Sequence, residues 1–187
     1  MAAFESSRSK SPLTPAAVAI VVLVDSRGEP CVPIFQRTSD MRRHASQMAL
    51  PGGKLHAGED ATGAALRELE EELGLRLDAD SVLGRLDDFD TKSGFTITPV
   101  VVWGGSDLRD LLPSKAEVAR LFPVPLAVLR QASSAAHPGA SELFSLLLPG
   151  VQVFAPTAAI LYQFSEVALE GRAVRVADFY QPPWTHR

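Results

Sequence analysis

The residues in this sequence best suited to chemistry are three glutamates and an arginine that lie close together. Glu68 stands three positions before Glu71 and four before Glu72, so on a helix it shares one face with both. Like charges at i, i+4 cost about 0.2–0.5 kcal/mol per pair on an exposed helix, and a cation removes that repulsion. Oxygen-only carboxylate clusters favour Mg²⁺ or Mn²⁺ over zinc. Arg67, four residues before Glu71, can pair with that carboxylate and orient it.

The segment that carries these side chains has the marks of a helix. Its apolar residues recur at i, i+3, i+4 and i+7, which gives one buried face: Ala65, Leu66, Leu69 and Leu73. Asp60 or Thr62 can cap its beginning, and Gly74 stands where a glycine ends many helices. Before it, the turn at Gly52 and Gly53 lets the backbone approach closely and offer a carbonyl as a further metal ligand. The bland alternative is a solvated acidic helix face with internal Arg–Glu pairs.

The spacing of the whole segment speaks against that alternative. Residues 53–75 read GKLHAGEDATGAALRELEEELGL: Gly, five residues, Glu, seven residues, then Arg-Glu-Leu-x-Glu-Glu-x-Gly-Leu. This resembles the Nudix box at every defined position. The resemblance implies an α/β fold, a Nudix-type α/β/α sandwich with a mixed, partly antiparallel sheet. It also implies hydrolysis of a nucleoside diphosphate linked to another moiety, with divalent cations bound against the diphosphate.

Residue roles follow from the same resemblance. The main metal ligands would be Glu68 and Glu72, with Glu71 assisting and the carbonyl of Gly52 or Gly53 completing the shell. Arg67 belongs to the same catalytic set. The general base stays open among three candidates: Glu68, Glu117 and Glu142. For the last two, an ordinary surface carboxylate is the alternative.

A basic segment lies directly upstream. Residues 37–53 read RTSDMRRHASQMALPGG and resemble the substrate motif of the coenzyme A diphosphatase subgroup of the Nudix family. The departures from that motif are Thr38, Ser46 and Leu50. Its basic residues suit a ligand with a phosphate beyond the diphosphate, such as the 3′-phosphate of coenzyme A. The substrate-binding candidates are therefore Arg37, Arg42, Arg43 and His44. A solubilising basic loop is the alternative.

Composition narrows the class of protein. The 187 residues carry a net charge of −4, which disfavours a nucleic-acid-coating surface. That sum conceals two neighbouring segments of opposite net charge, the basic segment at 36–54 and the acidic helix at 59–72. A single cysteine, Cys31, excludes an internal disulfide and any multi-cysteine zinc site. The longest apolar run, residues 16–24, is far shorter than the ~20 residues of a spanning helix, so we expect no membrane partner and a cytoplasmic protein.

The remaining elements predict how the chemical residues are positioned. We expect strands at 16–24, 31–36, 47–50, 82–90, 95–103, 143–148 and 151–154, and helices at 125–131 and 156–169 besides the acidic one. The chain is expected to divide into a flexible N-terminal arm (1–14), a Nudix hydrolase domain (15–171) and a C-terminal extension (172–187). A homodimer is compatible with the family.

These residues together predict an enzyme. We expect a Mg²⁺-dependent (or Mn²⁺-dependent) Nudix hydrolase that cleaves coenzyme A or a derivative to 3′,5′-ADP and 4′-phosphopantetheine. Two alternatives stay open. One is a Nudix pyrophosphatase for ADP-ribose, dinucleotides or noncanonical nucleoside triphosphates. The other is a nucleotide-binding Nudix domain without turnover, which usually lacks the box glutamates that this chain retains.

Overall fold

The central element of the fold is a mixed sheet. The computed structural model describes residues 4–38, 47–136 and 144–179. The long strand β1 (Thr14–Val24) pairs antiparallel with β2 (Pro30–Arg37) and β4 (Gly52–Lys54), and parallel with β7 (Phe95–Asp107). The remaining strands of this sheet pair antiparallel: β3 (Met48–Ala49) and β8 (Val118–Pro125) with β2, and β5 (Val82–Arg85) and β6 (Phe89–Asp90) with β7.

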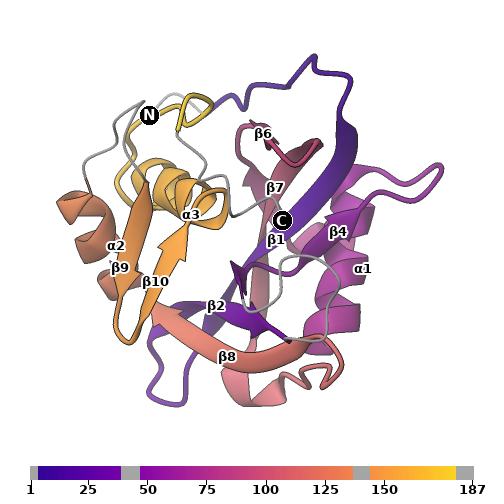
Figure 1. Ribbon diagram of the computed structural model, residues 1–187. Helices are drawn as coiled ribbons and strands as arrows, with labels where there is room; N and C mark the ends of the chain where they lie inside the picture. The colour runs from indigo at the N-terminus through magenta and orange to yellow at the C-terminus, as the bar shows by residue number, and fades with distance from the viewer. Residues whose placement is uncertain (1–3, 39–46, 137–143, 180–187) are drawn as a thin grey trace.

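Helices cover both faces of this sheet. Helix α1 (Ala61–Leu73) lies on one face, and Figure 1 shows the other helices and a separate hairpin on the opposite face. These are α2 (Leu126–Ala135), α3 (Thr157–Phe164), its π-helical continuation η3 (Ser165–Leu169), β9 (Ser145–Leu148) and β10 (Val151–Phe154). Two short 3₁₀ turns complete the elements, η1 (Ala79–Ser81) and η2 (Leu108–Asp110). The predicted α/β/α sandwich with a mixed, partly antiparallel sheet is confirmed.

Strand β1 separates two apolar cores because its side chains alternate between the faces. Ala19 and Val21 belong to the core under α1, together with Leu69 of that helix. Ile20 and Val22 belong to the other core, which is completed by α2 and α3. A strand buried on both faces reads as a continuous apolar run, which is why residues 16–24 lack polar alternation.

The acidic helix begins and ends as its sequence predicts. The Asp60 side chain accepts a hydrogen bond from the backbone N–H of Gly63 at 2.8 Å, which satisfies one free donor of the first turn. At the other end, Gly74 adopts the left-handed conformation with φ 69°, and its N–H bonds to the carbonyl of Glu70. Both ends of the segment that carries the candidate ligands are therefore fixed.

Several element boundaries differ from expectation. The strand expected at 82–90 is interrupted, because the N–H of Asp87 bonds to the Gln163 side chain and that of Asp88 to the carbonyl of Ser7. Strand β8 was not expected, since prolines occupy two of its positions, Pro123 and Pro125. Its pairing with β2 alone among the described strands is the edge position where a strand tolerates proline. Helix α2 runs to residue 135, beyond its expected end at 131.

Both terminal segments lie against the domain. Ser7, Arg8 and Ser9, in the arm expected to be flexible, hydrogen-bond to aspartates in the connection from β5 to β6 and in β6. In the expected C-terminal extension, Arg172 forms two hydrogen bonds with the buried Glu166 carboxylate. Within the described ranges, no helix combines the length and apolar character needed to cross a bilayer.

Candidate active site

The Glu72 carboxylate is almost fully buried and lies on the side of α1 that faces the sheet. Its Oε1 is 3.2 Å from Nη2 of Arg37, and its Oε2 accepts a hydrogen bond from the Gly52 N–H at 2.9 Å. Burial raises the pKa of Glu72 to about 8, because a carboxylate charge is poorly stabilised away from water. Arg37 and the Gly52 N–H oppose this rise in pKa, whereas the nearby charges of Glu68 and Glu117 add to it.

Three further glutamates are gathered around a single guanidinium. Arg67 donates to Glu59 at 3.0 Å, to Glu68 at 2.8 Å and to Glu71 at 3.2 Å. Its Nη2 also donates to the carbonyl of Lys54 at 3.0 Å. The hydrogen bond from Arg67 holds the pKa of Glu59 below its usual value, and Glu59 in turn raises that of the guanidinium. Arg67 therefore joins the acidic helix to the strand β4 that precedes it.

The two glycines of β4 permit this close approach. A Cβ on Gly53 would lie 2.1 Å from Oε1 of Glu68, so any other residue there would displace that carboxylate. A Cβ on Gly52 would lie 2.4 Å from the carbonyl oxygen of Ala17 and 2.5 Å from the Val18 side chain. The glycine pair thus brings the backbone of β4 against β1 on one side and against the helix carboxylates on the other.

The residues present fit a divalent cation of the hard, oxygen-preferring kind. Glu68 fills the space that a side chain on Gly53 would take, so this carboxylate lies beside backbone that can supply a carbonyl ligand. Glu72 is a buried carboxylate whose pKa is raised, and a cation would offset the cost of its charge. In the described ranges, no three Asp, Glu, His or Cys side chains already converge as a metal cluster. The carboxylates are instead grouped around Arg67 and Arg37.

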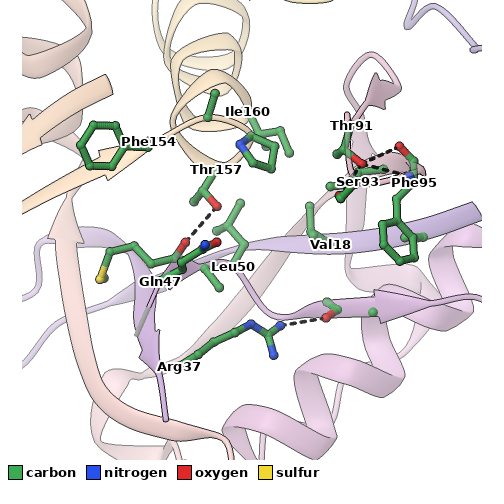
Figure 2. A pocket seen from close by; sticks show the side chains of 18 of the residues that line it. Val18, Arg37, Gln47, Leu50, Thr91, Ser93, Phe95, Phe154, Thr157 and Ile160 are labelled. Carbon is green, nitrogen blue, oxygen red and sulfur yellow. Dashed lines mark hydrogen bonds between the residues drawn. The ribbon is translucent and has the colours of Figure 1, made fainter. Parts of the chain in front are cut away.

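A cavity of about 370 Å³ opens beside these glycines (Figure 2). Its walls are largely apolar and include the aromatic rings of Phe95 and Phe154. Its basic lining residues are Arg37, which donates to the carbonyl of Gly52 at 3.3 Å, and Lys54, whose ammonium lies 5.4 Å from the centre of the Phe95 ring. The cavity thus places cations next to the acidic helix and offers an apolar interior.

The structure brings together most of the residues that the sequence singles out. Glu68, Glu71 and Arg67 form one cluster, Glu72 and Arg37 form another, and Gly53 lies between them and lines the cavity. Glu117 lies near enough to influence the charge of Glu72, and its carbonyl accepts a hydrogen bond from the N–H of Thr38. The other candidates lie outside the described residues: Arg42, Arg43, His44 and Glu142.

Sequence reasoning missed Lys54 as a residue of the site, and it missed Thr91 and Ser93 of the turn before β7 as part of the cavity wall. A signal for Lys54 was present, because it directly follows the glycine pair and must share its position. No such signal marks the turn, which reaches the cavity through the pairing of β1 with β7.

Known proteins resemble this chain in sequence. The family model described as NUDIX domain matches residues 13–144. A Cronobacter sakazakii protein named "Uncharacterized Nudix hydrolase NudL" is 38% identical over 120 residues, which cover 64% of this chain and 62% of that protein. The Yersinia enterocolitica protein of the same name is 37% identical over 109 residues, 58% of this chain and 55% of that protein. The matches thus span less than two thirds of the length of these relatives.

Solved structures share the fold at low sequence identity. A MutT/nudix family protein from Enterococcus faecalis superposes with a TM-score of 0.58 at 13% identity, covering 86% of this chain and 64% of that one. A Caenorhabditis elegans Ap4A hydrolase gives a TM-score of 0.54 at 17% identity, covering 85% of this chain and 99% of that one. Because the family model matches well over half of the chain, the chain belongs to the Nudix hydrolase family.

Proposed function

We propose that this protein is a divalent-cation-dependent Nudix hydrolase that cleaves the diphosphate linkage of coenzyme A or its derivatives. Water adds across the diphosphate: one bridging P–O bond breaks, and the products are 3′,5′-ADP and 4′-phosphopantetheine. The observation that carries the proposal is the glycine pair of β4, Gly52 and Gly53. It lines the cavity and contacts the carboxylates of Glu68 and Glu72.

The acidic helix supplies the ligand set of the proposed reaction. Glu68 and Glu72 would hold Mg²⁺ or Mn²⁺ with assistance from Glu71 and the carbonyl of Gly53. A cation bound there would neutralise diphosphate charge, and it would lower the pKa of a water that attacks phosphorus. Arg67 keeps Glu68 and Glu71 oriented through its hydrogen bonds. Glu117, whose charge acts on Glu72, is one candidate for the general base, with Glu68 and Glu142 as the others.

The cavity supplies the binding side of the proposal. Arg37 and Lys54 lie where the diphosphate would meet the acidic helix, and both are cationic donors suited to phosphate oxygens. The apolar interior with Phe95 and Phe154 is suited to a flat or apolar moiety of the substrate. Specificity for coenzyme A rests on the resemblance of residues 37–53 to the subgroup motif.

A substrate panel tests the proposal. Coenzyme A, dephospho-coenzyme A, ADP-ribose, a dinucleoside polyphosphate and a noncanonical nucleoside triphosphate are each incubated with Mg²⁺ or Mn²⁺, and products are identified by mass. We expect coenzyme A to give 3′,5′-ADP and 4′-phosphopantetheine. Its kcat/KM should exceed that of dephospho-coenzyme A by about tenfold or more, the worth of one charged hydrogen bond to the 3′-phosphate.

The same panel separates the alternatives. Cleavage of ADP-ribose, a dinucleotide or a triphosphate with no cleavage of coenzyme A would replace the substrate while keeping the enzyme class. Nucleotide binding without any product, in protein whose box glutamates are intact, would instead support a sensor without turnover.

A further inference from the structure

The N-terminal segment is attached to a run of aspartates that precedes one wall of the cavity. The N–H of Ser7 donates to Asp87, and the N–H of Ser9 donates to Asp88 at 3.0 Å. The Ser9 hydroxyl donates to Oδ2 of Asp90 at 2.7 Å. Asp87, Asp88 and Asp90 are thus each hydrogen-bonded to a segment about 80 positions away in the sequence.

Asp87 is the most buried of these aspartates, with 3% of its surface exposed. Besides the Ser7 N–H at 2.6 Å, its carboxylate accepts a hydrogen bond from Nε2 of Gln163 at 2.6 Å and pairs with Arg175. Arg175 also lies over the Phe4 ring, 4.8 Å from its centre, and donates to the carbonyl of Glu5. One carboxylate therefore joins the N-terminal segment, helix α3 and the C-terminal segment.

The run of aspartates leads directly into the cavity wall. Asp90 is followed by Thr91, which with Ser93 and Phe95 lines the cavity (Figure 2). The N-terminal segment continues along this turn, because the N–H of Thr14 donates to the carbonyl of Gly94 at 3.0 Å. Residues 7–14 thus hold both the approach to the turn and the turn itself.

The opposite wall depends on the same junction. Thr157 and Ile160 of α3 line the cavity from the side facing Phe95, as Figure 2 shows, and Gln163 is one turn further along that helix. The Gln163 side chain bonds to Asp87 through both its amide nitrogen and its oxygen. The two walls are therefore connected where the N-terminal segment meets Asp87.

We propose that residues 4–9 are a positioning element for substrate, which sets the width of the cavity through Asp87 and Asp90 and so selects the moiety that fills it. This inference rests on the proposed function, because the identity of the substrate determines which moiety fills the cavity. Helix α1 packs in the other core, which includes no residue of this segment. Changes in the segment should therefore alter substrate binding and leave the carboxylates of α1 in place.

The first test removes the contact to Asp90. Ser9→Ala deletes the hydroxyl that donates at 2.7 Å, and Ser11→Ala, at an exposed position two residues along, is the matched control. We expect Ser9→Ala to raise KM about three- to tenfold with kcat within about twofold of the wild type, the range found for residues acting through a contact network. Ser11→Ala should match the wild type in both constants.

A second pair of variants addresses the Asp87 junction through the backbone. Ser7→Pro removes the N–H that donates to Asp87, whereas Ser7→Ala keeps it. Hydrogen–deuterium exchange of residues 90–97 in substrate-free protein reads the positioning without any turnover. We expect exchange there to rise at least about threefold in Ser9→Ala and in Ser7→Pro, with Ser7→Ala and Ser11→Ala unchanged.

The outcomes separate this inference from the proposed function. A raised KM with faster exchange at 90–97 supports it. Faster exchange with unchanged KM overturns it, as does a loss of kcat that merely follows the fraction of folded protein. If coenzyme A is not cleaved, the proposed substrate is wrong. The wild type and Ser9→Ala are then compared by their dissociation constants for 3′,5′-ADP. Equal constants for the wild type and Ser9→Ala then overturn the positioning role.

Discussion

The carboxylate of Glu72 and the guanidinium of Arg37 lie 3.2 Å apart, and backbone groups of Gly52 form hydrogen bonds with both of them. The Gly52 N–H donates to the carboxylate, and its carbonyl accepts from the guanidinium. A buried acid is thereby linked to a cavity-lining cation through the backbone of one residue. In a buried pair of this kind, removing one partner leaves the charge of the other uncompensated, so a substitution of either residue also affects its partner.

Glu72→Gln should nearly abolish turnover while leaving the fold intact. Glutamine fills the same volume and still accepts from the Gly52 N–H, but it carries no charge for a divalent cation. We expect kcat to fall roughly 100-fold or more, the scale seen when one group that stabilises transition-state charge is removed. Steady-state kinetics with circular dichroism measures both effects. The control is Glu70→Gln, an exposed position of the same helix, and an unchanged rate in Glu72→Gln would refute the ligand assignment.

Adding a methyl group to each of the two glycines of β4 should have different effects on activity and stability. In Gly53→Ala the new Cβ meets the movable end of Glu68, so activity should fall while the free energy of unfolding changes by less than about 1 kcal/mol. In Gly52→Ala it meets the carbonyl of Ala17 and the Val18 side chain, so we expect a loss of about 1–3 kcal/mol in stability. Urea unfolding and kinetics on both variants check this, and equal stability losses would contradict the distinction.

Arg37→Ala should weaken substrate binding more than it weakens chemistry. The guanidinium lines the cavity and faces the acidic helix, where it can donate to a phosphate oxygen. Losing one hydrogen bond to a charged group is worth about 1.5–3 kcal/mol, so KM should rise roughly 10- to 100-fold. Arg37→Lys should recover part of this loss because the charge remains. Arg27→Ala, on the exposed turn after β1, is the control, and a KM equal to that of the wild type in Arg37→Ala would remove this residue from the binding site.

Local sequence signals predicted α1 well because every determinant of that helix is local. Its cap at Asp60, its apolar spacing and its terminal Gly74 all lie within fifteen consecutive residues, and the observed helix begins and ends between them. The box spacing then predicted which carboxylates lie beside Gly53. Those relationships need only one helix and the short strand before it.

Features that depend on distant segments could not be read in this way. Strand β8 contains Pro123 and Pro125, and among the described strands it pairs with β2. The break between β5 and β6 exists because Ser7 and Gln163 bind the backbone of residues 87 and 88, at separations of about 80 positions. Thr91 and Ser93 reach the cavity wall through the pairing of β1 with β7, which is why the sequence did not indicate them.

Removal of divalent cations should abolish activity reversibly. Chelation with EDTA is expected to stop product formation, and Mg²⁺ or Mn²⁺ should restore it, because the candidate ligands are all oxygens. A cation that binds only the folded protein also raises the midpoint of thermal unfolding, by an amount that grows with its concentration. Glu72→Gln should reduce that rise and Glu70→Gln should not. Full activity after exhaustive chelation would contradict the metal-dependent mechanism.

Cys31 should be inert toward thiol reagents in the folded protein. It is fully buried in the core under α1, and burial raises its pKa to about 11, with further upward contributions from Asp25 and Asp107. At pH 8 the folded protein therefore holds almost no thiolate, which is the reactive form, and the side chain is also shielded from the reagent. Titration with a chromogenic disulfide should detect no thiol in native protein and one equivalent in denaturant, since the sequence has a single cysteine. Reaction of native protein at pH 8 within minutes would show that the core beneath α1 opens, and with it the support of Glu68 and Glu72.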